Sequence, residues 1–290
     1  MNESEKTFYV VYDLSIRPPQ YDFLCFMAQA RTVARGYNVH VIFKPREDGG
    51  YVLKGKQGYT DAEALYRLEH ILFPACIIYG ATFTVLPYRD AALPPGNYLN
   101  GVDHKISSLV DIWETAGDLF RPQATARSSQ LVASYVEQFK KPIVTITLRD
   151  TWRYETKNSN TEAWFEFAHT IEHEFQPVFV PDTGKAFDAW DQPFPSFPAA
   201  AIDLDTRLAL YEQADMNCFT FNGPGNMCWW SNVPLLFFLH ADDTYWSQEQ
   251  FAAARHPVGE QPPYFKERQK IVWGLDELPA IKKAFAEMYA

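Results

Sequence analysis

The sequence lacks both a long apolar run and an excess of positive charge. A membrane-spanning helix needs about 18 or more consecutive apolar residues, and the chain of 290 residues contains no such run. The formal net charge is −10, whereas surfaces that bind DNA or RNA neutralise phosphates with lysine and arginine. We therefore expect no nucleic acid partner. A local cationic pocket for a phosphate group remains compatible with this charge.

Cysteine is scarce and shows no metal-binding or redox spacing. The four cysteines stand in apolar contexts without a C-x-x-C pair: Cys25, Cys76, Cys218 and Cys228. This pattern predicts reduced, buried thiols of the kind found in cytoplasmic proteins. The polar segment Met1–Lys6 does not resemble a secretory signal peptide. We expect a cytoplasmic protein, and peripheral association with a membrane stays open.

The residues that are abundant predict a globular α/β protein. Hydrophobic residues make up 47% of the chain and charged residues 21%, a balance that allows a substantial core. A β-rich run at 7–12, helical periodicity over 21–35 and a second β-rich run at 39–43 predict a βαβ unit. Its two strands should be parallel, because such crossovers are right-handed. The next expected elements are a helix over 61–72 and strands at 75–79 and 82–86.

A second alternation of strands and helices begins with the strand predicted over 143–148. The expected elements after it are a helix over 161–175, strands near 178–180 and 200–202, a helix over 205–214, strands at 216–221 and 234–238, and a final helix from 276. We predict two Rossmann-like α/β domains, residues 1–125 and 126–290, that face a cleft. In such folds ligands bind at the carboxyl ends of the strands.

The loop after the strand at 143–148 is the first candidate site. It offers three cations and several polar donors, among them Arg149, Arg153, Lys157, Asn158 and Ser159. A guanidinium at a strand end suits a diphosphate, because its planar fork binds two oxygens at once. Ser159 and Glu162 have capping-box spacing, which predicts the start of the next helix. A plain polar loop in which Arg149 pairs with Asp150 or Glu155 explains the same residues.

A glycine-rich turn between two apolar runs is the second candidate site. Asn222, Gly223, Pro224 and Gly225 follow the predicted strand at 216–221. Glycines permit close backbone approach or a positive φ, and backbone N–H groups at a helix start bind anions. A tight connection without a ligand is the alternative interpretation.

Three further side-chain groups are chemical candidates. His169, Glu172 and His173 match H-x-x-E-H, and histidines at i and i+4 of a helix share a face that binds zinc. The same segment also fits a plain amphipathic helix with solvent-facing histidines. Asp22, at the start of the first helix, is a candidate general base, and helix capping is its alternative role. Asp13, at the end of the first strand, is the second choice of base.

Taken in order, the elements of residues 142–240 resemble the nucleotide-sugar-binding half of GT-B glycosyltransferases, in particular the bacterial heptosyltransferase-like enzymes. The matching features are the strand and polar loop before Trp164, the helix at 207–215, the turn at Gly223-Pro224 and the strand that begins near Pro234. The family's usual turn is acidic-Thr-Gly-Pro, whereas this chain carries Phe221-Asn222 before the Gly-Pro pair.

The resemblance implies a glycosyltransferase that moves a sugar from a nucleotide-activated donor to the hydroxyl of a carbohydrate or glycolipid acceptor. The first domain would take the acceptor and the second the nucleotide sugar. Arg149, helped by Arg153 or Lys157, and the N–H groups after Gly223 would neutralise the diphosphate without a metal or other cofactor. Asp22 would deprotonate the acceptor. The alternatives are a nucleotide- or sugar-binding protein of this fold without transfer activity, and a zinc hydrolase centred on His169.

Overall fold

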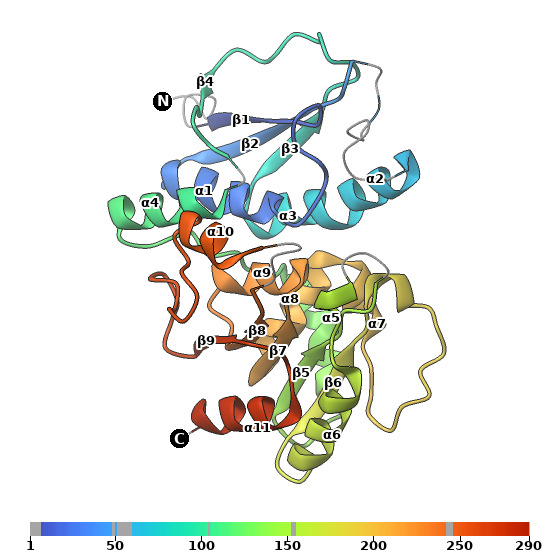
Figure 1. Ribbon diagram of the computed structural model, residues 1–290. Helices are drawn as coiled ribbons and strands as arrows, with labels where there is room; N and C mark the ends of the chain where they lie inside the picture. The colour runs from blue at the N-terminus through green and yellow to red at the C-terminus, as the bar shows by residue number, and fades with distance from the viewer. Residues whose placement is uncertain are drawn as a thin grey trace. The chain divides into compact units, whose positions relative to one another are not determined.

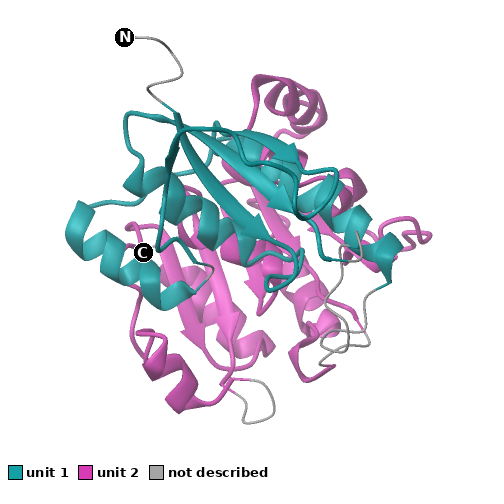
Figure 2. Ribbon diagram, turned by 90° about the horizontal axis from the view of Figure 1, so that it is seen from above, with its two compact units in different colours: residues 1–123 teal, residues 124–290 magenta. Residues whose placement is uncertain are grey.

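The chain forms two compact α/β units. The computed structural model describes residues 7–47, 50, 60–103, 105–151, 155–241 and 246–289. The units comprise residues 1–123 and 124–290 (Figure 2). Within the described residues, no helix has the length and apolar character that a membrane span requires. Cys25, Cys76, Cys218 and Cys228 are all buried free thiols, which confirms the prediction from their spacing.

The first unit contains a parallel sheet with strand order β3-β2-β1-β4 (Figure 1). Its strands are β1 (Thr7–Asp13), β2 (Asn38–Lys44), β3 (Thr82–Val85) and β4 (Asn97–Tyr98). Helix α1 (Phe23–Val33) connects β1 to β2, and the two strands pair in parallel as predicted. Helix α4 (Ile106–Ala116) packs against α1. The packing of this unit is rich in rings: Tyr12 contacts Phe23, Phe26 and Phe43.

The predicted strand at 75–79 is wrong. The residues continue the preceding helix, which runs through α2 (Asp61–Arg67), a π-helical turn at Leu68–Leu72 and α3 (Phe73–Ile78). Pro74 stands just after the π-helical turn, and its missing N–H removes one backbone hydrogen bond from this continuous helix. A short apolar run is equally typical of a buried strand and of a buried helix, so the sequence pattern alone does not separate the two.

The second unit contains a parallel sheet with strand order β6-β5-β7-β8-β9. Its strands are β5 (Ile143–Thr147), β6 (Gln176–Val180), β7 (Met216–Thr220), β8 (Leu235–Leu239) and β9 (Gln269–Trp273). Every residue of β5, β7 and β8 is buried, as expected for strands covered on both faces. The helices are α5 (Ala126–Val136), α6 (Thr161–Ile171), α7 (Pro198–Ile202), α8 (Leu204–Gln213), α9 (Gly223–Trp229), α10 (Gln248–Ala253) and α11 (Leu278–Glu287).

Helices cover both faces of the second sheet (Figure 1). On one face, α6 and α11 bury a shared core in which Phe167 and Phe285 meet edge to face, with ring centroids 5.0 Å apart. On the other face, Tyr211 of α8 and Trp229 of α9 contact the rings of Phe219 and Phe237. The predicted strand at 200–202 is wrong, because these residues form α7, in which Pro198 occupies the first turn.

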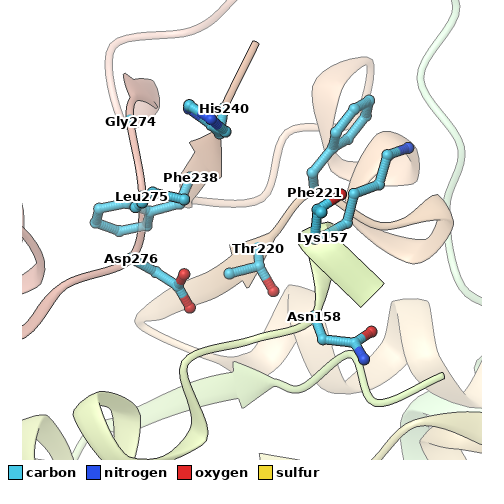
Figure 3. A pocket seen from close by; sticks show the side chains of 10 residues that line it. Lys157, Asn158, Thr220, Phe221, Phe238, His240, Gly274, Leu275 and Asp276 are labelled. Atoms are coloured by element: carbon cyan, nitrogen blue, oxygen red, sulfur yellow. The ribbon is translucent and has the colours of Figure 1, made fainter. Parts of the chain in front are cut away.

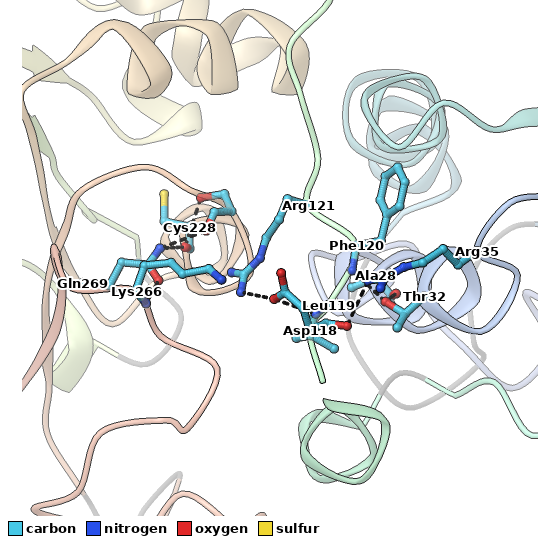
Figure 4. Close-up of polar contacts among 11 residues, drawn as sticks. Ala28, Thr32, Arg35, Asp118, Leu119, Phe120, Arg121, Cys228, Lys266 and Gln269 are labelled. Carbon is cyan, nitrogen blue, oxygen red and sulfur yellow. Dashed lines mark hydrogen bonds and ion pairs between the residues drawn. The ribbon is translucent and has the colours of Figure 1, made fainter. Parts of the chain in front are cut away.

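Buried polar contacts fix the connections of each unit (Figure 4). In the first unit, Thr32 Oγ1 donates to the Ala28 carbonyl at 2.7 Å and accepts the Phe120 N–H at 2.8 Å. In the second unit, Gln269 Nε2 donates to the carbonyl oxygens of Cys228, Ser231 and Val233 at 2.7 to 3.1 Å. A single amide on β9 therefore holds the segment that leads from α9 to β8.

Candidate functional site

The strand order of the second sheet marks one place for a ligand. The chain passes from β5 to β6 on one side and then crosses to β7 on the other side. Connections that leave neighbouring strands in opposite directions open a crevice at the strands' carboxyl ends, where ligands of doubly wound sheets bind. The residues at this switch point are the loop after Thr147 and the turn after Thr220. They are the two segments that the sequence analysis selected.

The loop after β5 is closed by hydrogen bonds between its two ends. The Arg149 N–H donates to Ser159 Oγ at 2.8 Å, and the Ser159 N–H donates to the Arg149 carbonyl at 2.9 Å. The Thr151 N–H donates to Asn158 Oδ1 at 3.1 Å, and Asn158 Nδ2 donates to the Thr151 carbonyl at 2.9 Å. These bonds fix the loop ends, so Asn158 and Ser159 shape the loop. Arg153 lies outside the described residues.

Ser159 also joins the two candidate segments. Its Oγ lies 2.6 Å from Thr220 Oγ1 at the end of β7. The expected capping box from Ser159 to Glu162 is wrong, because Asn160 is the N-cap of α6 and its Oδ1 accepts the Ala163 N–H at 3.2 Å. The Ser159 hydroxyl is thereby engaged with Arg149 and Thr220 instead of the helix.

A cation–ring contact forms a second connection between the segments. Lys157, in the short 3-10 turn Glu155–Lys157, places Nζ 4.0 Å from the centroid of the Phe221 ring. An ammonium group over a ring face is attracted by the ring quadrupole. Lys157 is therefore held beside the turn that follows β7, where an anionic ligand would need a cation.

The turn after β7 offers fewer backbone donors than its sequence suggests. Asn222 caps α9, and its Oδ1 accepts the Gly225 N–H at 2.7 Å. Pro224 has no N–H, and the Gly225 N–H is already bonded to Asn222. Neither Pro224 nor Gly225 can therefore donate a backbone hydrogen bond to a ligand. Gly225 is required by packing, because a Cβ atom there would overlap the ring of Phe237. The close approach that this glycine permits is therefore between its own backbone and the Phe237 ring of β8.

Asn222 has a further feature that bears on ligand binding. The residue is 7% exposed, and its Nδ2 finds no hydrogen-bond partner among the described residues. Buried amide donors in proteins are nearly always paired with protein, water or ligand. This donor is the polar group of the turn that a bound oxygen would satisfy.

A pocket opens at the carboxyl edge of the sheet (Figure 3). Of the residues predicted from the sequence, Lys157 and Asn158 line it. Arg149, Ser159 and the segment 222–225 are not among its described wall residues. The empty space in the pocket, counted together with the solvent at its open mouth, is about 340 Å³. The wall is formed by Thr156, Lys157, Asn158, Thr220, Phe221, Phe238, His240, Gly274, Leu275 and Asp276.

Asp276, after β9, is a buried acid of the pocket wall that no sequence pattern indicated. It is 6% exposed, and its Oδ2 accepts the Trp164 indole N–H at 2.6 Å and the Asn160 N–H at 2.8 Å. Burial raises the pKa of this carboxyl, and the two hydrogen bonds oppose that shift. Its partners stand more than 100 positions earlier in the chain, so no local sequence pattern indicates the cluster.

Asp13, in the first unit, is engaged in an ion pair. Arg89 Nη1 lies 2.8 Å from Asp13 Oδ1, and Arg89 Nη2 lies 3.0 Å from Oδ2. Oδ1 also accepts the Ser15 N–H and hydroxyl. Burial raises the pKa of Asp13, but the hydrogen bonds from Arg89 and Ser15 outweigh it and hold the pKa below its usual value. A carboxylate held this way is a weak proton acceptor.

Asp22, the other acid of the first unit, does not cap α1. Its backbone is helical, with φ −61° and ψ −17°, and its side chain makes no capping hydrogen bond, whereas a capping residue has extended geometry. Its Oδ2 accepts Gln20 Nε2 at 2.5 Å instead. The capping alternative is therefore wrong, and the role of Asp22 as a base stays a prediction.

The H-x-x-E-H segment does not form a two-histidine helix face. Helix α6 ends at Ile171, Glu172 is its C-cap, and His173 lies in the following turn. The His169 side chain is 54% exposed, and its Nδ1 lies 3.4 Å from Glu172 Oε1. In the part of the chain that the structure describes, no group of three or more His, Cys, Asp or Glu side chains could hold a metal ion.

Comparison with known proteins gives the fold a context. No family model matches the sequence, and no curated protein matches it. The solved structure of ADP-heptose lps heptosyltransferase II from E. coli is similar, with a TM-score of 0.50 and 10% identity over 98% of this chain and 100% of that chain. A glycosyl transferase family 9 structure from Veillonella parvula has a TM-score of 0.49 and 11% identity over 99% of this chain and 91% of that chain. The likeness to heptosyltransferase II confirms the predicted GT-B-like α/β fold with parallel sheets.

Proposed function

We propose that the chain is a glycosyltransferase that moves a sugar from a nucleotide-activated donor to an acceptor hydroxyl. The observation that carries the proposal is the junction at the switch point of the second sheet. There the Arg149–Ser159 loop and the end of β7 are joined by the 2.6 Å contact between Ser159 and Thr220. A cation-bearing loop and a capped glycine turn at one sheet edge are the parts that a diphosphate site needs.

The donor diphosphate is proposed to bind beside this junction. Arg149 would bind two phosphate oxygens at once, as a planar guanidinium does. Lys157, held against Phe221, would supply a second positive charge. The Asn222 Nδ2, which lacks a described partner, would donate to a further oxygen. With these groups the leaving diphosphate would be neutralised without a metal ion, and the nearby Gly223–Gly225 backbone would contribute the Gly223 N–H.

The transfer step is proposed to use a carboxylate of the first unit. Asp22 would accept the proton of the acceptor hydroxyl while the acceptor oxygen bonds to the anomeric carbon. The bond from that carbon to the phosphate oxygen breaks, and the nucleoside diphosphate leaves. Asp13 is the weaker candidate, because Arg89 and Ser15 occupy its oxygens.

ADP-heptose is the first donor that we propose to test. The solved E. coli protein that shares this fold is described as an ADP-heptose heptosyltransferase. The acceptor is proposed to be a carbohydrate or glycolipid, and the site of action the cytoplasm.

A thermal-shift screen tests the proposal. The probes are ADP, UDP, GDP and CDP and their sugars, ADP-heptose included, with EDTA present. A ligand at 100 times its Kd adds about 2.7 kcal/mol to the free energy of unfolding, which raises Tm by roughly 5 °C or more. We expect at least one nucleotide to do so, and the matching nucleotide sugar to lose its sugar to an acceptor.

Two outcomes would contradict the proposal in different ways. No shift with any nucleotide would refute nucleotide binding altogether. A reproducible shift without transfer to any carbohydrate or glycolipid acceptor would instead support a non-catalytic nucleotide- or sugar-binding protein.

A further inference from the structure

The pocket at the carboxyl edge of the second sheet has a cationic side and an anionic side. In Figure 3, Thr220 lies between Asp276 on one side and Lys157 with Phe221 on the other. The Lys157 ammonium is held over the Phe221 ring at 4.0 Å. The wall therefore carries opposite charges on two different segments, the loop after β5 and the residues after β9.

The anionic side is fixed in place. Two N–H groups, from Asn160 and the Trp164 indole, donate to Asp276 Oδ2, and such donors favour the ionised form of a carboxylate. Both partners belong to the start of α6, which is packed in the core. The carboxylate consequently cannot swing away from an unsuitable ligand.

The remaining wall is amphipathic. Phe221, Phe238 and Leu275 supply apolar surface, whereas Thr156, Asn158 and His240 supply hydroxyl, amide and imidazole groups. A sugar ring has the complementary character, with an apolar C–H face and a rim of hydroxyl groups. Apolar walls with a few placed polar groups are typical of pockets that orient small ligands.

We infer that this pocket holds the sugar of the donor and selects an uncharged sugar over one that carries a carboxylate. The inference rests on the proposed function and adds the substrate class. The phosphate end of the donor lies toward Lys157, and a hydroxyl group of the sugar donates to Asp276. A uronic acid places a second carboxylate near Asp276, where like charges repel, whereas Lys157 lies on the other side of the pocket beside the phosphate end of the donor.

Sugar 1-phosphates test the pocket without the nucleotide. The neutral probes are glucose and galactose 1-phosphates, and the acidic probes are glucuronic and galacturonic acid 1-phosphates. Each pair differs only at C6, so binding measured by ligand-observed NMR isolates the charge. We expect at least one neutral probe to bind, and its uronic counterpart to bind ten-fold or more weakly.

Two variants assign the selectivity to Asp276. In Asp276→Asn the difference in affinity between a neutral sugar 1-phosphate and its uronic counterpart should narrow to less than three-fold. Because this change also removes charge-assisted bonds to Asn160 and Trp164, His240→Lys is the second variant. His240 is exposed, and a lysine there adds a cation to the pocket wall without disturbing the core. We expect it to strengthen binding of the uronic probe at least three-fold relative to its neutral partner.

Three results would overturn the inference: no neutral probe binds, the uronic probes bind as well as the neutral ones, or folded variants keep the full selectivity. The proposed function fails separately, through the nucleotide screen. Nucleotide binding without selectivity among sugar 1-phosphates would refute only the pocket assignment. Selective sugar 1-phosphate binding without any nucleotide binding would refute the glycosyltransferase proposal while keeping the pocket.

Discussion

Ser159 Oγ lies 2.6 Å from Thr220 Oγ1, and this contact joins two segments that are 61 residues apart in the chain. Ser159 also accepts the Arg149 N–H. One hydroxyl therefore sets the start of the loop after β5, its end, and its distance from β7. The position of the Arg149 backbone depends on this junction.

Removing the Ser159 hydroxyl should destabilise the second unit and loosen the loop. Ser159→Ala leaves the Arg149 N–H and the Thr220 hydroxyl without this partner, which costs about 1–3 kcal/mol of unfolding free energy when the groups are buried. Urea denaturation followed by circular dichroism measures the loss. Ser134→Ala is the matched control, because Ser134 is exposed on α5 and its hydroxyl donates to the Gln130 carbonyl in the same helix. An equal effect in both variants would contradict the role of the junction.

Adding a methyl group at Gly225 should be costly for reasons of packing. Its Cβ would overlap the Phe237 ring and lie 3.0 Å from Asn222 Oδ1, the atom that caps α9. Overpacking of this kind costs about 1–3 kcal/mol. We expect Gly225→Ala to lower Tm and to weaken nucleotide binding, as measured by thermal unfolding with and without ADP.

Gly184→Ala is the control for that substitution. Its added Cβ would lie 3.7 Å from Asp182 Oδ1, an ordinary contact, and its φ is not positive. Where the backbone suits alanine, the change is neutral or stabilises by about 0.4–1 kcal/mol. If Gly225→Ala lowered Tm no more than Gly184→Ala does, the close packing of Gly225 in α9 against Phe237 in β8 would be contradicted.

Stability should fall in mild acid because of His256. The residue is 3% exposed; its Nδ1 lies 2.8 Å from the Ala254 carbonyl, and its Nε2 lies 2.8 Å from the Tyr264 hydroxyl. Burial lowers the pKa of His256 from its ordinary value of 6.5. The unfolded chain therefore binds the proton first. The contribution of neutral His256 to the free energy of unfolding is fully present above pH 6.5 and is lost as the pH falls toward the folded-state pKa.

The slope of stability against pH tests this assignment. Below pH 6.5, His256 should contribute up to about 1.4 kcal/mol per pH unit to the fall in unfolding free energy. His256→Gln should flatten that slope between pH 6.5 and the folded-state pKa, whatever its effect on absolute stability. His40 also has a pKa lowered by burial, and it contributes to the slope in both proteins. The quantity to compare is therefore the difference between the slope of the wild type and the slope of His256→Gln. Identical slopes would show that His256 is not held neutral.

The sequence predicted most of the second sheet because its strands are continuous apolar runs between clear turns. The segments 143–148, 216–221 and 234–238 correspond to β5, β7 and β8. Short runs of apolar or small residues were harder to assign to a strand or a helix. The segments 75–79 and 200–202 were predicted as strands and proved helical. Strand β9 was missed because it begins Gln269-Lys270, and the Gln269 amide is buried by its bonds to three carbonyls, which is a tertiary effect.

The candidate site was predictable in its segments and not in its contacts. Strand ends and turns located Arg149, Lys157 and the turn at Asn222, since parallel strands bring their carboxyl ends to one edge. No local pattern indicated that Ser159 would bond to Thr220 instead of capping α6. Asp276 was equally hidden, because its partners Asn160 and Trp164 are 116 and 112 positions away.

The most direct test of the account is donor turnover by Arg149→Ala, with Arg149→Lys alongside. Arg149 is the residue proposed to bind the diphosphate bidentately, and its loop is fixed through backbone bonds that neither substitution removes. We expect Arg149→Ala to lower both sugar transfer and donor hydrolysis about 100-fold or more, with Tm within a few degrees of wild type, and Arg149→Lys to recover only part of the activity. Unchanged transfer and hydrolysis in a folded Arg149→Ala variant would contradict the account.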